Sequence, residues 1–171
     1  MIGKNISLRA LEPKDVDFIA SIENNNENWR ISNTYIPYSR FEVEQYIMSI
    51  GHDIFADKQL RLVITENSTD KNCGCIDLFD FELRHKRAGV GIIINKDFRS
   101  KGFAKESLEL MIDYAKKTLG LHQLYCNIQE DNFISIKLFE SLGFIKQGTK
   151  IQWEWYENKF ADVFFYQLIF N

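Results

Sequence analysis

The sequence lacks a long apolar run. Its apolar stretches are far shorter than the ~20 residues that a membrane-spanning helix needs. The start, Met-Ile-Gly-Lys-Asn, leads into an alternating stretch and has no apolar core of the kind that a secretory signal carries. We therefore expect a cytoplasmic protein that has no membrane partner.

An excess of charge of one sign is also missing. Lys and Arg number 21 and Asp and Glu number 24, which gives a formal net charge of −3. Proteins that bind nucleic acid or anionic membranes usually carry a basic field, so we expect neither partner. The length of 171 residues and the hydrophobic content of 45% are typical of a globular protein and predict a single domain over residues 1–171.

Residues that form disulfides or bind metals are scarce. The chain has three cysteines, an odd number, and three histidines that follow no ligand spacing. Cys73 and Cys75 would have to recruit further metal ligands from elsewhere in the chain. We expect reduced cysteines on or beside strands, and no metal site.

Hydrophobic periodicity predicts an α+β fold. Strands are expected at residues 6–11, 60–65, 73–83, 89–95 and 123–129, with two or three more within 144–170. Helices are expected at residues 13–24, 41–50, 103–119 and 132–142, the last capped by Asp131. The order β-α-α-β-β-β-α-β-α-β-β describes a mixed, mostly antiparallel sheet flanked by helices. One parallel crossover, through helix 103–119, interrupts it.

A cationic loop that contains glycine precedes the strong helix predicted at 103–119. Its positive residues are Arg99, Lys101 and Lys105. A helix N-terminus has unpaired N–H groups and a partial positive charge, and acidic side chains usually lie there. Here only Asp97 precedes the loop and Glu106 follows it. This pattern indicates either solvated lysines on an exposed loop or a site for an external anion, which Gly102 would let the backbone approach.

Three segments resemble the GCN5-related N-acetyltransferase (GNAT) superfamily. The sequence Arg99-Ser100-Lys101-Gly102-Phe103-Ala104 resembles its Arg/Gln-x-x-Gly-x-Gly/Ala signature. Residues 132–144, Asn-Phe-Ile-Ser-Ile-Lys-Leu-Phe-Glu-Ser-Leu-Gly-Phe, and residues 8–15, Leu-Arg-Ala-Leu-Glu-Pro-Lys-Asp, resemble two further recurrent blocks. The similarity spans nearly the whole chain. It is closest to the branch with spermidine acetyltransferases and ribosomal-protein N-terminal acetyltransferases.

The resemblance implies acetyl-CoA as co-substrate and places it on the chain. Backbone amides of the signature loop would hold the pyrophosphate, and the loop residues are Arg99, Ser100, Lys101, Gly102, Phe103 and Ala104. The backbone of Ile92, Ile93 and Ile94 would pair with the pantetheine arm. Asn132 matches a position of cofactor contact in the family, although it also suits the first turn of a helix.

The same resemblance leaves proton transfer open. Related enzymes commonly use a tyrosine to protonate the leaving CoA thiolate, and the matching residue here is Phe139. Either another group serves, for which Tyr125 on the neighbouring strand is the first candidate, or CoA leaves as an unaided thiolate, which a thiol pKa of ~8.5 allows.

A general base or a desolvated site is also needed, because an aliphatic amine with a pKa of ~10.4 is protonated at neutral pH. Residues 88–91 hold no carboxylate of the kind that some family members use. The nearest acids are Asp77, Asp80 and Glu82. We favour Asp80, since Phe79 and Phe81 beside it would desolvate its carboxylate. A base that acts through ordered water is the alternative.

The acceptor side is expected to come from residues 24–40 and 150–160. Six of their aromatic residues could line an acceptor pocket, although most aromatic residues simply belong to the core: Trp29, Tyr35, Tyr38, Trp153, Trp155 and Tyr156. Polyamine-acetylating relatives carry an acidic pair in the segment that matches 32–37, where this chain has Asn33 and Thr34, so polyamine recognition through that segment is in doubt.

The predicted function is N-acetyl transfer from acetyl-CoA, by direct attack, to a primary amine of a small molecule or a protein N-terminus. The alternative is a catalytically weak acyl-CoA-binding sensor or regulatory protein with the same fold. Exposed strands near the C-terminus suggest a homodimer.

Overall fold

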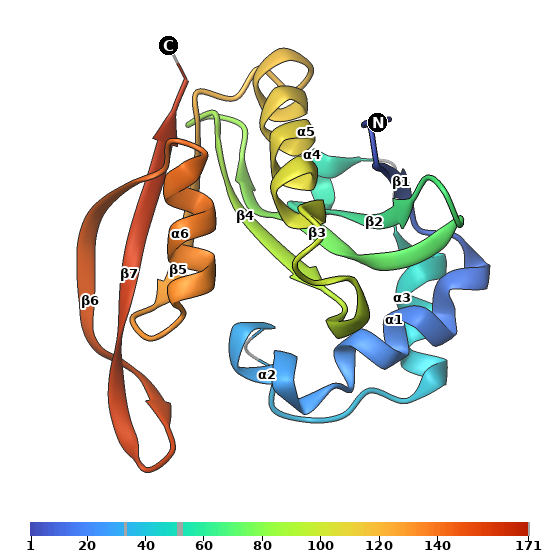
Figure 1. The fold of residues 1–171 in the computed structure, drawn as a ribbon, viewed down its shortest axis with the longest axis horizontal. Coiled ribbons are helices and arrows are strands. Elements are labelled where there is room, and N and C mark those ends of the chain that lie inside the picture. The colour runs from blue at the N-terminus through green and yellow to red at the C-terminus, as the bar shows by residue number, and fades with distance from the viewer. Residues whose placement is uncertain (33, 51–52, 171) are drawn as a thin grey trace.

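The protein is described by a computed structural model that covers residues 1–32, 34–50 and 53–170. Its seven strands form one sheet in the order β1-β2-β3-β4-β5-β7-β6 (Figure 1). The strands are β1 (Ile6–Ala10), β2 (Leu60–Glu66), β3 (Lys71–Glu82), β4 (Arg87–Ile94), β5 (Gln123–Gln129), β6 (Ile145–Tyr156) and β7 (Lys159–Ile169). The helices are η1 (Pro13–Asp15), α1 (Val16–Glu23), α2 (Asn26–Ser32), α3 (Arg40–Ser49), α4 (Ile54–Asp57), η2 (Lys96–Phe98), α5 (Phe103–Lys117) and α6 (Phe133–Ser141).

The sheet has two antiparallel parts that meet at a short parallel junction. Strands β1 to β4 form one part, and β5, β7 and β6 form the other. Strands β4 and β5 pair at three positions, Arg87↔Gln123, Ala88↔Leu124 and Gly89↔Tyr125. Within the described chain no β4–β5 pair lies beyond Gly89, and Figure 1 shows the two strands separating from there. A split therefore opens in the sheet after Gly89.

Apolar side chains pack on both faces of the first part of the sheet. Helix α5 covers one face, where Leu108 and Met111 are fully buried among the sheet residues. Helices α1 and α3 cover the other face through Ile19 and Val43, which pack with Cys75 of β3. The helices thus hold the strands on one side of the split in place.

A buried charge cluster joins α1 to the sheet. Arg61 of β2 lies 2.6 Å from Asp77 of β3 and also pairs with Glu23 of α1. The three side chains are 13–16% exposed. Burial raises the pKa of the Asp77 carboxyl, and the charge of Arg61 opposes that effect.

The predicted fold class, order of elements and parallel crossover are confirmed, with element ends within a few residues of those expected. Three short helices, α2, α4 and the 3-10 helix η2, were not predicted. Helix α2 falls in a segment expected to be irregular, and tertiary contacts hold it: Trp29 Nε1 donates to the carbonyl of Glu23 at 2.8 Å, and Asn28 Nδ2 donates to the carbonyl of Ile22 at 3.1 Å. Helix α4 follows an Asp53 cap. In the described part of the chain, no helix is long and apolar enough to cross a membrane.

The predicted cap of α6 is wrong. Asn132, not Asp131, precedes the helix, and its Oδ1 accepts a hydrogen bond of 3.2 Å from the backbone N–H of Ser135. Asp131 instead forms an ion pair of 2.7 Å with Arg30. A long-range cation competes for the carboxylate, which no local pattern reveals.

Candidate active site at the split between two strands

The N-terminus of α5 lies beside the split and is uncapped. Gly102, the residue before the helix, has φ of 81° and supplies no side-chain cap. The backbone N–H groups from Gly102 to Lys105 find no acceptor among the described residues. A Cβ at Gly102 would meet nothing within 4 Å, so the surface in front of these donors is open. Such a terminus is able to hold an anion.

The acid in the first turn of α5 is already engaged. The backbone N–H and the side-chain Nδ2 of Asn5 donate to the two carboxylate oxygens of Glu106, each at 2.8 Å. These hydrogen bonds lower the pKa of Glu106 against the opposing effect of its burial. Glu106 therefore leaves the helix N–H groups free.

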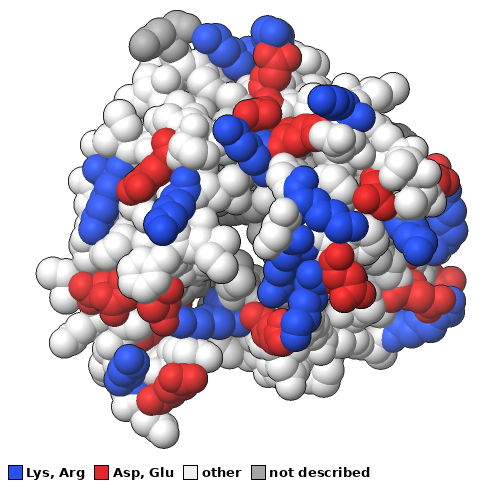
Figure 2. Space-filling model, in the orientation of Figure 1, with Lys and Arg blue, Asp and Glu red and all other residues white. Residues whose placement is uncertain are grey.

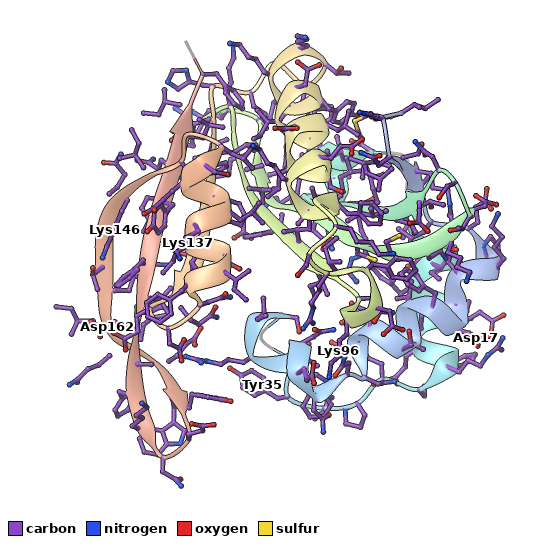
Figure 3. The ribbon with its side chains drawn as sticks, viewed as in Figure 1. Asp17, Tyr35, Lys96, Lys137, Lys146 and Asp162 are labelled. Atoms are coloured by element: carbon purple, nitrogen blue, oxygen red, sulfur yellow. The ribbon has the colours of Figure 1, made fainter. Side chains whose placement is uncertain are left out.

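Two of the three predicted loop cations, Arg99 and Lys101, have partners in the protein, and Lys105 is exposed without an ion pair in the described structure. Arg99 Nε donates to the carbonyl of Ile94 at 3.0 Å. Lys101 Nζ lies 3.7 Å from Glu66 and 4.9 Å from the centre of the Phe98 ring. Lys96, near α2 in Figure 3, lies 3.7 Å from Glu27. Arg99 and Lys101 are thus held by contacts within the protein, while Lys105 is open to solvent.

The predicted strand residues line one edge of the split. Ile92 and Ile94 pack against the core below α5, and Ile93 packs toward α1 and α3, so their side chains are structural. Their register partners are all on β3, so the other backbone edge of β4 faces the split. In the orientation of Figure 1, Figure 2 shows an opening near the centre of the molecule, with Lys and Arg side chains gathered below and to its right.

At the narrow end of the split, the two predicted catalytic residues are in contact. The hydroxyl of Tyr125 donates a hydrogen bond of 3.1 Å to Oδ2 of Asp80. Asp80 lies in an irregularity of β3 where the register shifts, and its φ is 48°. Burial, followed by the negative charge of Asp80, raises the pKa of Tyr125 to about 12. The phenol therefore keeps its proton at neutral pH.

The carboxylate of Asp80 is more exposed than expected, and unlike the other two candidate acids it forms no ion pair in the described structure. Its side chain is exposed, so the expected desolvation by Phe79 and Phe81 is wrong; the irregularity turns the carboxylate outward. The other two candidate acids are paired with cations, Asp77 with Arg61 and Glu82 with Arg87 at 2.7 Å. Of the three, Asp80 is the carboxylate with no ion pair in the described structure.

A row of rings beside Tyr125 was not predicted. The Phe79 ring meets the Tyr125 ring edge-on at 6.0 Å, and Phe165 of β7 lies 5.7 Å from Tyr125 on the other side. Phe79 lies over Gly89, where an added Cβ would come within 2.2 Å of the ring. The two glycines of β4, Gly89 and Gly91, were the available signal, since they leave room for a bulky neighbour.

Phe139 and Asn132 have structural roles. Phe139 is 4% exposed and packs edge-on against Phe144 at 5.0 Å. Asn132 caps α6 as described above, and a contact with CoA stays a prediction. Cys73, Cys75 and Cys126 are free and buried. No cluster of three or more possible metal ligands occurs among the described residues.

Helix α2 spans the split on the expected acceptor side. Arg30 lies 2.7 Å from Asp131 and 3.3 Å from Glu154 of β6, and its guanidinium carbon lies 4.0 Å from the centre of the Tyr156 ring. Gln129 of β5 donates to Glu154 at 2.8 Å. These contacts connect the two parts of the sheet beyond the short β4–β5 junction.

The predicted acceptor aromatics do not gather into one pocket. Trp29 holds α2, and Tyr156 covers Arg30. Trp153 and Trp155 are 64% and 63% exposed on β6, and Tyr35 is 78% exposed. Asn33 lies outside the described residues, and the hydroxyl of Thr34 is 2.9 Å from that of Ser32.

The sequence profile of the acetyltransferase (GNAT) domain matches residues 5–145. The chain belongs to the GNAT acetyltransferase family. The predicted family and enzyme class, an N-acetyltransferase, are thereby confirmed.

Curated relatives of this GNAT chain include spermidine N(1)-acetyltransferases. That of Vibrio cholerae is 29% identical over 163 residues, which cover 95% of this chain and 91% of the relative. That of Escherichia coli K12 is 29% identical over 144 residues, which cover 84% and 75% of the two chains.

Solved structures also resemble this GNAT fold over almost its whole length. The Vibrio cholerae spermidine N-acetyltransferase in complex with CoA and spermine superposes with a TM-score of 0.86 at 25% identity, covering 98% of this chain and 96% of that one. A dodecameric structure of that enzyme gives a TM-score of 0.83 at 26% identity, with 98% and 95% coverage.

Proposed function

We propose that residues 1–171 form one GNAT domain that transfers the acetyl group of acetyl-CoA to a primary amine of spermidine or a similar polyamine. The observation that carries the proposal is the split between β4 and β5. An uncapped helix start lies at its wide end, and the Tyr125–Asp80 pair lies at its narrow end. The full-length similarity to spermidine acetyltransferases supports the choice of acceptor.

The free backbone groups suit the three parts of acetyl-CoA. The unpaired N–H groups from Gly102 to Lys105 suit the pyrophosphate, and the open space at Gly102 admits it. The free edge of β4 at residues 92–94 suits the amide-bearing arm. With these two parts in place, the thioester points toward Gly89 and Tyr125, where the strands meet.

The Tyr125–Asp80 pair suits both proton transfers. Asp80, directly or through a water molecule, accepts the proton that the attacking amine loses. The amine nitrogen bonds to the thioester carbon, a β4 backbone N–H stabilises the developing oxyanion, and the carbon–sulfur bond breaks. Tyr125 gives its proton to the departing thiolate and recovers one from Asp80 through their hydrogen bond. Counted from the neutral amine, this sequence neither gains nor loses a proton; a protonated amine first releases one proton to solvent.

The exposed carboxylate of Asp80 favours a cationic substrate. Asp80 is exposed, and the side chain of Asp131 is 54% exposed at the end of β5. Glu154 lies between Arg30 and Gln129. Negative charge around a cleft attracts polycations and raises their local concentration. Asp131 and Glu154 are already paired with Arg30, so Asp80 is the carboxylate of this group that is left to attract a polyamine.

An acceptor panel tests this function. Release of free CoA thiol from acetyl-CoA would be followed with spermidine, spermine, single amino acids, aminoglycosides and peptides with a free N-terminus. We expect the highest kcat/KM with a polyamine. Preference for the peptides would identify a protein N-terminus as the acceptor, and CoA binding without thiol release from any amine would identify a sensor.

We extend the proposal to self-association in the cytoplasm. The aromatic residues of β6 are exposed at the edge of the sheet, and a relative forms a dodecamer. The homodimer predicted from the exposed C-terminal strands is the smallest such assembly. Light scattering coupled to size-exclusion chromatography distinguishes a monomer from a dimer and from larger assemblies.

A further inference from the structure

We infer that Phe79 limits the acyl group that this site accepts to one about the size of acetyl. The inference rests on the proposed function, because it requires the thioester to lie in the split. It adds a specificity-determining residue, and it assigns that role to a side chain with no polar atom and therefore no part in proton transfer.

Phe79 fills the space that two glycines leave on β4. A Cβ at Gly89 would lie 2.2, 2.5 and 2.7 Å from three carbons of the Phe79 ring, and a Cβ at Gly91 would lie 3.6 Å from it. Phe79 and Gly89 are also register partners in the β3–β4 ladder. The ring thus lies directly against the β4 backbone, in the space that a side chain at residue 89 would otherwise occupy.

The Phe79 ring lies at the narrow end of the split, where β4 and β5 still pair. Gly89 and Tyr125 form the last β4–β5 pair before the strands separate. Phe79 contacts both, since its ring also meets Tyr125 edge-on at 6.0 Å. With the pyrophosphate at the wide end, the acyl chain points toward the narrow end, and each added methylene moves the chain end closer to these two rings.

Tyr125 is less free to move than Phe79. The Tyr125 hydroxyl is bound to Asp80, and the other side of its ring is against Phe165 at 5.7 Å. Phe79 has no hydrogen-bonding group, so packing alone keeps its ring in place. Close-packed interiors resist added volume, so a longer acyl chain would have to displace one of the rings. Truncation of Phe79 would open space above Gly89 and Gly91 while leaving the Tyr125–Asp80 pair intact.

The transfer chemistry is the same for every acyl group. The amine nitrogen bonds to the thioester carbon, and the carbon–sulfur bond breaks. The nitrogen loses one proton, and the departing thiolate gains one. Only the fit of the acyl tail changes. Specificity is therefore measured as the ratio of kcat/KM for a longer acyl-CoA to kcat/KM for acetyl-CoA, which cancels any general loss of activity in a variant.

The test compares the chain with its Phe79→Ala and Phe79→Leu variants on acetyl-, propionyl-, butyryl- and hexanoyl-CoA with one saturating amine. The unaltered chain should lose activity steeply beyond acetyl. Phe79→Ala should raise the butyryl-to-acetyl ratio about tenfold or more, as expected for one or two methylenes in a confined pocket. Phe79→Leu, which keeps more of the core filled, should raise it less and serves if the alanine variant does not fold.

Phe165→Ala is the matched control, because it also removes a ring beside Tyr125 but on the β7 side. The Phe165→Ala variant should keep the butyryl-to-acetyl ratio of the unaltered chain. An unchanged ratio in both Phe79 variants, or an equal rise in the Phe165 variant, would overturn the inference while leaving acetyl transfer established. If the unaltered chain transfers no acetyl group at all, the proposed function itself fails.

Discussion

The hydroxyl of Tyr125 and the carboxylate of Asp80 are joined by a hydrogen bond of 3.1 Å between residues 45 positions apart. The bond reaches from β5 to β3, across the end of the β4–β5 junction. One residue keeps a proton at neutral pH, and the other is a carboxylate open to solvent. A proton donor and a proton acceptor are thus in contact at the place of the proposed reaction.

Tyr125→Phe should lower kcat about 100-fold and leave the Kd for acetyl-CoA nearly unchanged, because it removes a proton donor and no phosphate contact. Steady-state kinetics and calorimetric titration measure the two quantities. Tyr114→Phe on α5 is the control, and it should leave both unchanged. Equal activity of the Tyr125 variant and the unaltered chain would remove Tyr125 from the mechanism.

The pH profile gives an independent check on Tyr125. Its pKa is raised to about 12, so the phenol stays protonated through the usual assay range. The rate should rise with pH as the amine loses its proton, with no fall from Tyr125 at pH 10, where an ordinary tyrosine ionises. The raised pKa also means that this group favours the folded state below pH ~10 and loses that effect as the pH rises through about 12.

Gly102→Ala should weaken acetyl-CoA binding about tenfold or more. The residue has φ of 81°, and a Cβ there points into the open space in front of the free N–H groups. Backbone strain alone should lower stability by about 1–2 kcal/mol. Gly120→Ala is a close control, because Gly120 also has a positive φ, of 62°, and open space around it, but lies after the far end of α5.

Both glycine variants should lose similar stability in thermal unfolding, while only Gly102→Ala loses affinity for acetyl-CoA in calorimetric titration. Equal affinity in the two variants would show that the loop does not hold the phosphates.

Arg61→Ala should lower the free energy of unfolding by about 3–5 kcal/mol, because it leaves the carboxylates of Asp77 and Glu23 buried without a cation. The pKa of Asp77 is already raised by burial, and loss of Arg61 would raise it further. A raised pKa in the folded state means stability that is present at low pH and lost as the pH rises through that pKa.

The difference in free energy of unfolding between the Arg61 variant and the unaltered chain should therefore be smaller at pH 5 than at pH 8. Urea unfolding at the two pH values measures the difference. A gap that is the same at both pH values would mean that lost packing, and not unpaired charge, accounts for the change.

Phe139→Tyr should change kcat more than the Kd for acetyl-CoA. The position matches the tyrosine that related enzymes use, yet the ring here is 4% exposed and packed against Phe144. A hydroxyl left unsatisfied at this site would lower stability by about 1–3 kcal/mol. Kinetics and thermal unfolding together separate a gain in proton transfer from a loss of packing. A changed Kd with unchanged kcat would contradict this expectation.

Elements with a regular apolar period could be predicted from the sequence, and irregular ones could not. The 3.6-residue repeat of α5 and the Gly120 that follows it are local signals. Helix α2, Asn-Glu-Asn-Trp-Arg-Ile-Ser, has no such repeat, and two of its first three residues are asparagines, which have low helix propensity. Contacts of Trp29 and Asn28 with α1 hold it, and such contacts are known only when the fold is known.

The candidate site divides in the same way. The loop proposed to bind phosphate could be predicted, because Gly102 and the nearby charges are adjacent in sequence. Tyr125 and Asp80 were predictable as separate candidates, but their contact depends on the irregularity at Asp80 and on the pairing of β4 with β5. Phe79 carried no signal of its own, since an aromatic residue in a strand is usually core. Its position over Gly89 required the register of β3 against β4.

The most direct measurement is the release of CoA thiol from acetyl-CoA in the presence of spermidine, with the Tyr125→Phe and Asp80→Asn variants alongside. We expect saturable, spermidine-dependent release by the unaltered chain, and a loss of kcat of similar size, about 100-fold, in each variant, since the two groups act through one hydrogen bond. Tight binding of acetyl-CoA with no release above background for any amine would contradict the proposed function.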